Sequence, residues 1–318
     1  SVARDLCGLQ SQFLSNAFHS LFIRTREQLS PDSWGEGLVK TWTIRGTVHV
    51  ISAEDLGLFL TDLTAEKIDE WKDGCAVTAG RKKYFADLII KLIENGITDR
   101  AELKERCFQA GMTETEAPDL FHQWGGIIRE LCEKGRICYK VQEKKSFILC
   151  PPFESMDFNS ARLEIVRRYF TNYGPATIKD AAYFLGVPQR DVKNYLDQLP
   201  YSTVLVENKT YYYIPQQKNY NQDISRCIFL AGFDPLMLGY EKKESLFLPP
   251  EYLRCIFNLA GIVMPSVLYN GKVIGKWKRN KRKLMITPFE HLTESMKRDI
   301  SDAAEQLWRD VIPVYSDM

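Results

Sequence analysis

The alternation of hydrophobic and polar residues predicts the same succession of elements twice in the middle of the chain. In the first copy, apolar residues at helical spacing predict helices over 79–95, 99–110 and 114–134. Residues 136–150 then alternate between apolar and polar around a polar turn, which is typical of a β-hairpin. A glycine follows each of the three helices and marks its end.

The second copy follows after a short interval. Helices are predicted over 161–173, 178–185 and 188–199, and Thr177 stands at the position that caps the short middle helix. Residues 202–214 predict another hairpin, because apolar and aromatic residues flank a polar turn.

Helix, short helix, helix and hairpin is the order of a winged-helix unit. In such units the second helix of the turn pair normally tracks DNA, and the hairpin lies on the DNA backbone. Two copies, with a degenerate copy over residues 1–51, indicate a repeat architecture that binds DNA. The alternative is that these units serve only as packing modules in a protein that does not bind DNA.

The last part of the chain has a different pattern. Polar residues over 216–223 predict a linker, and a buried strand follows it. The clearest hairpin of the chain spans Ser266–Trp277, because its Asn270-Gly271 pair suits a type I′ turn. A helix over 292–311 is expected at the end of the chain.

These elements predict an α+β fold, with tandem winged-helix units followed by a β-rich, barrel-like unit that carries a terminal helix. The N-terminal unit combines an amphipathic helix over 12–26 with β structure over 41–51. The expected units are an N-terminal winged-helix-like unit at 1–78, a second winged helix at 79–155, a third winged helix with its linker at 156–222, and the C-terminal unit at 223–318.

Composition describes an ordinary soluble chain. Of 318 residues, 45% are hydrophobic and 26% charged, and no apolar run approaches the roughly 18 residues of a membrane helix. The first residues show no signal-peptide pattern, so we expect a cytoplasmic monomer without membrane contact. The eight cysteines form no Cys-x-x-Cys pair and no histidine lies at ligand spacing from them, which favours reduced core thiols and neither metal nor cofactor.

The distribution of charge carries more information than the net charge of +1. Seven basic residues and no acidic residue lie between positions 272 and 283. This basic segment consists of Lys272, Lys276, Lys278, Arg279, Lys281, Arg282 and Lys283. Lysines also protect exposed sheet edges, but seven cations exceed that need and predict contact with the phosphates of double-stranded DNA.

Standard catalytic motifs such as Gly-x-Ser-x-Gly, His-Glu-x-x-His and the phosphate-binding loop are missing from the sequence. A more specific pattern lies near the N-terminus, where Gln10-Ser11-Gln12 directly precedes the first predicted helix. The segment Thr41-Trp42-Thr43-Ile44-Arg45-Gly46-Thr47-Val48-His49 follows it.

Together these segments resemble the AlkZ-type (AlkZ- and YcaQ-like) winged-helix DNA glycosylases of bacteria, which carry Gln-x-Gln before a helix and then Thr-Trp-x-x-Arg-Gly-Thr-x-His. The resemblance continues in the family's order through Gly174-Pro175-Ala176-Thr177 with Asp180, Phe233-Asp234 with Leu238-Gly239-Tyr240, and the hairpin from Pro265 to Trp277. Ser11 departs from the pattern, because the family usually has an apolar residue there. Family members also usually carry another helix before this point, so we expect an incomplete or divergent floor of the site.

The resemblance implies a monofunctional glycosylase that hydrolyses the N-glycosidic bond of alkylated bases and unhooks interstrand crosslinks. A purine alkylated at N7 or N3 is already a cationic leaving group, so the enzyme mainly has to place a water and stabilise an oxocarbenium-like sugar. Gln10 and Gln12 would position that water, because a carboxamide donates and accepts hydrogen bonds but is no general base. This requires an extended or irregular backbone between them, which Gly8 allows. Spacing alone would favour two solvated amides at a helix N-terminus.

Further candidates for the lining of the site each have a simpler alternative. Trp42 and Trp277 either stack on bases or pack in a core, and Arg45 contacts either a phosphate or a surface carboxylate. His49 either faces the lesion or is a hydrogen-bonded strand residue. Asp234 either lines the site, as the resemblance implies, or caps a turn.

These observations support a glycosylase whose three winged helices form a concave face for alkylated double-stranded DNA. The main alternative is a non-catalytic winged-helix DNA-binding protein, either a regulator or a structural binder. A third hypothesis is a protein-interaction module that has lost its DNA contacts. Release of an alkylated base from DNA would discriminate between the first hypothesis and the other two.

Overall fold

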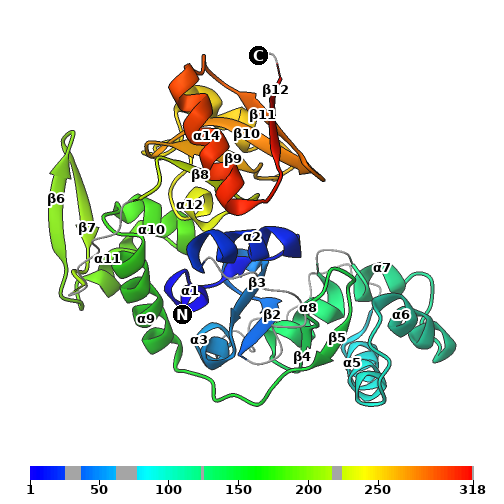
Figure 1. The fold of residues 1–318 in the computed structure, drawn as a ribbon. Coiled ribbons are helices and arrows are strands. Elements are labelled where there is room, and N and C mark those ends of the chain that lie inside the picture. The colour runs from blue at the N-terminus through cyan, green and yellow to red at the C-terminus, as the bar shows by residue number, and fades with distance from the viewer. Residues whose placement is uncertain (26–36, 62–76, 123–124, 217–223, 317–318) are drawn as a thin grey trace. The chain divides into compact units, whose positions relative to one another are not determined.

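The computed structural model describes residues 1–25, 37–61, 77–122, 125–216 and 224–316 (Figure 1). Contacts divide the chain into two compact units. Unit 1 comprises Ser1, Ala3 and Ser30–Ile165, and unit 2 comprises Val2, Arg4–Leu29 and Val166–Met318. The four units predicted from the sequence are a finer division and stay a prediction. Within the described ranges, no helix is long and apolar enough to cross a membrane.

Unit 1 contains an antiparallel sheet that uses the predicted β structure of the Thr-Trp segment. Strands β2 (Leu38–Trp42) and β3 (Val48–Ser52) pair with each other, and β4 (Ile137–Tyr139) and β5 (Phe147–Leu149) extend the sheet from β2. The many β-branched residues of β2 and β3 suit a pleated surface. A single 3-10 turn, η2 (Ile44–Gly46), joins these two strands.

The helices of unit 1 follow the predicted order, with one interruption. They are η3 (Ala53–Asp55), α3 (Leu56–Phe59), α5 (Ala79–Glu94), α6 (Arg100–Gln109), α7 (Ala117–Leu120) and α8 (Gly126–Glu133). The continuous helix expected over 114–134 was wrong, because Gly126 has a φ of +67° and a Cβ there would lie 2.5 Å from the Leu120 carbonyl oxygen. Phe85, Leu103 and Phe147 are fully buried in the core between helices and sheet.

The second predicted succession is present in α9 (Phe158–Asn172), α10 (Ile178–Leu185), α11 (Gln189–Leu196), β6 (Ser202–Val206) and β7 (Lys209–Tyr213). The boundary between the two units falls within α9. Thr177 and Asp180 form the capping box that starts α10, and Gly186, with a φ of +68°, ends it. The β6–β7 hairpin turns at Glu207 and Asn208, which both have positive φ.

The C-terminal part of unit 2 is built on a five-stranded sheet in the order β12-β11-β10-β9-β8 (Figure 1). Its elements are β8 (Cys227–Leu230), α12 (Pro235–Leu238), η4 (Pro250–Tyr252), α13 (Leu253–Ile256), β9 (Ser266–Tyr269), β10 (Lys272–Asn280), β11 (Lys283–Pro288), α14 (Glu294–Leu307) and β12 (Ile312–Tyr315). The type I′ turn is consistent with its prediction, because Asn270 and Gly271 have φ values of +47° and +79°.

Two expectations for this part need correction. The sheet is open rather than barrel-like in the described residues, with β8 and β12 as its edges. Helix α14 packs on the sheet through Ile300 and Ala304, which are fully buried together with Phe229. The predicted terminal helix ends at Leu307, and the chain then forms β12, which runs parallel to β11.

Candidate active site and DNA-binding surface

The Gln10-Ser11-Gln12 segment joins β1 (Leu9–Gln10) to helix α2 (Leu14–Thr25). Leu9 and Ser11 are buried, at 1% and 0% exposure, whereas Gln10 is half-buried and Gln12 is exposed. The strand itself ends at Gln10 and the chain bends at Gln12, so the alternation of burial, in which residues two apart share a side, continues one step beyond the strand. The two carboxamides therefore lie on the accessible side of the segment, and the position where the resembled family has an apolar residue is a buried one.

The turn that leads into this segment needs an unusual backbone. Cys7 and Gly8 both have positive φ, at +54° and +89°. Cys7 is fully buried, which fixes the turn to the core of unit 2. Gly8 thus adopts a conformation that glycine tolerates best, one residue before β1.

A buried ion pair between Arg24 and Asp234 anchors helix α2. The Asp234 carboxylate is 0% exposed, and the Arg24 guanidinium donates to both of its oxygens at 2.7 and 3.0 Å. The Ser20 hydroxyl donates to the same carboxylate at 2.8 Å, and the Leu236 backbone amide donates at 2.9 Å. Bidentate pairing of this kind fixes geometry as well as adding energy. Asp234 consequently fastens α2 to the start of α12.

The charge state of Asp234 follows from these contacts. Burial raises the pKa of its carboxyl, but the Arg24 charge and the hydrogen bonds outweigh burial and hold the pKa below its usual range. The group therefore stays ionised. Because the carboxylate is fully buried and accepts four hydrogen bonds, the structure points to a positioning role for it rather than contact with a substrate.

The first turn of α2 packs against the loop before α12. Phe13 follows Gln12, and its ring stacks on Phe233 with centroids 5.9 Å apart. A side chain at Gly232 would place its Cβ 2.8 Å from the Asn16 amide nitrogen and 3.0 Å from the Val263 carbonyl oxygen, so both groups would have to shift to admit it. The residues that directly follow the two glutamines are thus closely packed against the loop before α12.

The middle of α2 contacts an aromatic cluster that no sequence pattern predicted. His19 stacks on Trp308 at 5.6 Å and lies 5.2 Å from the Trp277 ring. The pKa of His19 is lowered from its ordinary value, because burial outweighs the opposing effect of its 2.7 Å hydrogen bond to the Phe229 carbonyl oxygen. The Trp277 indole donates to the Leu230 carbonyl oxygen at 2.8 Å, which favours the core interpretation of this tryptophan.

Trp42, Arg45 and His49 belong to unit 1, whereas the two glutamines belong to unit 2. Trp42 is 6% exposed, donates to the Tyr139 hydroxyl at 3.2 Å and lies under the Arg129 guanidinium at 4.8 Å. This environment is that of a core residue. His49 is 2% exposed and its Nδ1 is 3.0 Å from the Thr47 carbonyl oxygen, as expected of a hydrogen-bonded strand residue. The Arg45 side chain lies outside the described residues.

The basic segment forms one hairpin tip and one separate lysine. β10 and β11 pair up to Asn280 and Lys283, so that Lys281 and Arg282 form the turn. Lys276 is half-buried, and the basic residues from Lys278 to Lys283 are exposed. Lys272 is the first residue of β10. At about 3.3 Å per residue it lies about 26 Å from Asn280 at the other end of the strand, so it does not belong to the tip.

The cations of this tip differ in their partners. Arg282 pairs with Asp310 at 3.1 Å, and Arg279 lies over the Trp308 ring at 5.3 Å. Among the described residues, no carboxylate pairs with the other four cations. These four, called the tip lysines below, are Lys276, Lys278, Lys281 and Lys283. Their charges are therefore available to an anionic partner.

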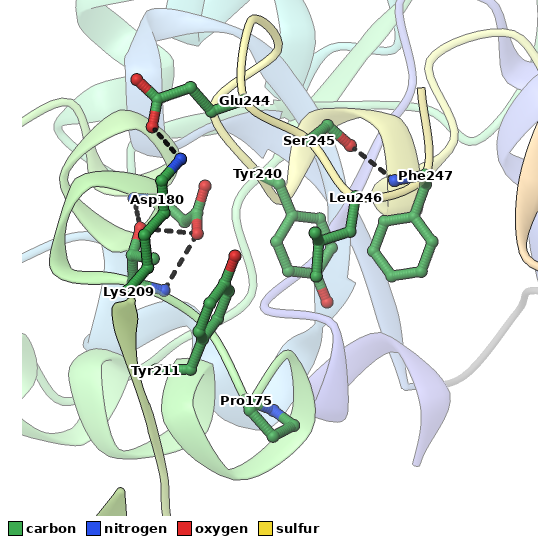
Figure 2. Close-up of a pocket in the computed structure, with 10 residues that line it drawn as sticks. Pro175, Asp180, Lys209, Tyr211, Tyr240, Glu244, Ser245, Leu246 and Phe247 are labelled. Carbon is green, nitrogen blue, oxygen red and sulfur yellow. Dashed lines mark hydrogen bonds and ion pairs between the residues drawn. The ribbon is translucent and has the colours of Figure 1, made fainter. Parts of the chain in front are cut away.

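The later motif residues line a small pocket, where their contacts have a structural explanation (Figure 2). Asp180 accepts hydrogen bonds from the Thr177 hydroxyl at 2.7 Å and from the Glu241 backbone amide at 2.9 Å. The Tyr240 hydroxyl donates to the Tyr173 carbonyl oxygen at 2.8 Å, and Lys209 pairs with Glu244 at 3.2 Å. These contacts join the three-helix unit of unit 2 to the loop that follows α12.

Among the described residues, no group of three His, Cys, Asp or Glu side chains could hold a metal ion.

Comparison with known proteins relates nearly the whole chain to one family. A family described as "DNA glycosylase AlkZ-like" matches residues 3–309. A curated relative, the "Interstrand DNA cross-link repair glycosylase" of Streptomyces sahachiroi, is 22% identical over 311 residues, which are 91% of this chain and 84% of the relative. The solved structure of the Streptomyces sahachiroi DNA glycosylase AlkZ superposes with a TM-score of 0.78 at 22% identity, covering 99% of this chain and 92% of that one.

Proposed function

This chain belongs to the AlkZ-like DNA glycosylase family, and we propose that it hydrolyses the N-glycosidic bond of alkylated, cationic purines with a water held by Gln10 and Gln12. Membership makes it a DNA repair enzyme that acts on N-glycosyl bonds, rather than a non-catalytic DNA-binding protein. Because the curated relative is named for the repair of interstrand crosslinks, the proposal includes such crosslinks among the substrates.

The observation that carries the proposal is the alternating burial along the Gln10-Ser11-Gln12 segment. Gln10 and Gln12 are accessible, whereas Ser11 between them is buried. Each carboxamide offers an oxygen acceptor and an NH₂ donor, so the pair can hold one water from two directions. Neither accepts a proton readily, which limits such a site to leaving groups that are already activated.

A cationic purine is such a leaving group. The water oxygen bonds to C1′ of the deoxyribose as the bond from C1′ to the purine nitrogen breaks. The purine takes that electron pair and leaves neutral, and the water releases a proton to solvent. The products are a free alkylated base, an abasic sugar and a proton. The protein contributes placement of the water and a site where the oxocarbenium-like sugar forms.

Release of base is the direct test. Duplex DNA treated with a methylating agent is incubated with the protein, and free 7-methylguanine is measured by mass spectrometry. The proposal expects release of this cationic base and none of unmodified guanine from the same duplex. Equal release of both, or of neither, would contradict it.

We further propose that the helix-and-hairpin units are winged helices that track the duplex and that the tip lysines bind its backbone. Their support is the element order, together with four cations that no described carboxylate neutralises. The seven described cysteines are free thiols, which supports a cytoplasmic location for a protein that we expect to act as a monomer.

Reversing charge at Lys276, Lys278 and Lys281 should flatten the salt dependence of binding to duplex DNA. Each phosphate contact contributes about 0.9 to the slope of log K against log salt concentration. Loss of three contacts should therefore reduce the slope by about 2.7, and affinity should fall most at low salt. Fluorescence anisotropy over a salt series measures both quantities.

Lys272→Glu is the matched control, because it reverses the same charge on the same strand away from the tip. Its slope should stay close to that of the unchanged protein. If the triple variant kept the original slope, the tip lysines would not be the DNA-binding surface.

A further inference from the structure

An exposed leucine lies at the tip of a hydrogen-bonded loop in the C-terminal part of unit 2. Leu259 is 89% exposed, although burying a leucine side chain away from water stabilises a protein. Its neighbours at the base of the loop, Phe257 and Val263, are 8% and 3% exposed and belong to the core. A single exposed leucine is common on protein surfaces. The case for a function rests on the loop and its location.

The loop is held by its own backbone. Phe257 and Val263 form a β-bridge, and the Asn258 amide donates to the Ile262 carbonyl oxygen at 3.1 Å. The Asn258 side chain accepts in turn from the Ile262 amide at 2.8 Å. Gly261 has a φ of +78°, as the tight turn requires. None of these contacts involves the Leu259 side chain, so the loop presents it without depending on it.

The base of this loop adjoins the segment that carries the glutamines. The Phe233 amide donates to the Val263 carbonyl oxygen at 3.3 Å, and the Phe233 ring stacks on Phe13, the residue after Gln12. Leu259 is four residues from Val263, so at most about 14 Å of extended chain separate them. The loop of Leu259 and the residue that directly follows the glutamine segment thus both contact Phe233 within unit 2.

The surroundings of Leu259 suit a polyanion. It lines a surface pocket with Arg254, Asn258 and Ala260, and Arg254 is exposed. The sequence contains no acidic residue from Tyr252 to Phe289. Lys242 lies 5.7 Å from the Phe257 ring at the base of the loop. An apolar tip with Arg254 beside it fits duplex DNA, whose phosphates are anionic and whose stacked bases are apolar, although Glu251 and Glu290 lie near Tyr252 at the start of this stretch.

We propose that Leu259 is a wedge that enters the base stack of duplex DNA beside the nucleotide being excised; this rests on the glycosylase function proposed above. Enzymes that act on a base must take its nucleotide out of the helix, and apolar side chains inserted between base steps stabilise the distorted duplex. Leu259 fills the place that the displaced nucleotide leaves. It is a positioning residue, because it favours the extruded state without touching the reacting atoms.

The first test compares substrates that need extrusion with those that do not. Leu259→Ala should lower kcat/KM for release of 7-methylguanine from a duplex about tenfold, which corresponds to about 1.4 kcal/mol. Release from a single strand of the same sequence should change less than about twofold, since no stack has to be opened. Leu259→Met should retain most duplex activity. Ile224→Ala, at a residue that is 82% exposed outside the loop, should affect neither substrate.

The second test does not depend on catalysis. In a protein that also carries Gln10→Ala and Gln12→Ala, binding to a duplex with 2-aminopurine next to an abasic-site analogue should raise fluorescence as the base unstacks. Leu259→Ala should remove that rise, whether or not the wild-type protein releases any base. If the rise and the duplex-to-single-strand ratio both stayed unchanged, the wedge would be excluded. If the variant instead abolished self-association in sedimentation runs while leaving unstacking intact, Leu259 would belong to an interface between copies.

Discussion

Replacing both Gln10 and Gln12 with alanine should lower the single-turnover rate of 7-methylguanine release by at least about 100-fold, the order of loss seen when one preorganised hydrogen-bond donor is removed from an active site. Gln10 and Gln12 are accessible on either side of the buried Ser11. In the proposed reaction they hold the water that attacks C1′. Alanine offers no polar atom, so the water loses its fixed position.

Affinity for alkylated duplex DNA should change little in these variants. Gln12 is exposed and Gln10 half-buried, and neither carries charge, so the electrostatic part of DNA binding is retained. The single variants should each show most of the kinetic loss, because two groups that hold one water act as a unit. Anisotropy titrations and single-turnover kinetics on one duplex separate the two effects.

Gln306→Ala is the matched control, since it removes an exposed glutamine from α14. It should leave the rate unchanged. Gln12→Glu sharpens the test further. A carboxylate still accepts from water but donates no hydrogen bond. Near-normal rates in the double alanine variant would show that the water is held elsewhere, and the glycosylase function would then need another catalytic group.

The sequence predicted the parts of this fold that depend on local signals. The Asn270-Gly271 turn, the Thr177–Asp180 capping box and the helical end at Gly186 each follow from residues within a few positions of each other. The backbone between Gln10 and Gln12, on which the catalytic hypothesis depends, is extended at Gln10 and bends at Gln12, and Gly8 before it has a positive φ.

Local sequence signals could not predict which residues pair over long distances in the chain. Arg24 and Asp234 are 210 residues apart, and nothing in an amphipathic helix pattern shows which distant carboxylate its arginine will meet. Strand β12 was not predicted, because four residues are too few to show a period and its parallel partner β11 is recognised only in the folded chain. The open sheet likewise depends on which strands become edges.

Asp234→Asn should be the most destabilising single change in unit 2 that leaves side-chain size unaltered. It would leave the Arg24 guanidinium, only 24% exposed, without its anionic partner. Breaking a buried ion pair from one side typically costs about 3–5 kcal/mol. We therefore expect a loss in this range, together with faster hydrogen exchange of the α2 amides.

The exposed pair Lys193–Asp197 is the matched control, because its side chains are 39% and 50% exposed. Asp197→Asn should change stability by less than about 1 kcal/mol. The double change Arg24→Met with Asp234→Asn should cost less than Asp234→Asn alone, since no buried charge remains unpaired. A greater loss in the double variant would mean that the pair is not the main fastening of α2.

The pH dependence gives an independent check with a definite sign. The pKa of Asp234 in the folded protein lies below its usual range. Its stabilisation is therefore complete above the ordinary carboxyl pKa of about 3.9 and is lost as the pH falls towards the lower folded value. Asp234→Asn should remove this part of the acid-induced loss. Because the glutamine segment leads directly into α2, the same variant should lower base release at neutral pH, while Asp197→Asn should not. If α2 exchange and base release both stayed unchanged in Asp234→Asn, the buried pair would not position the active segment.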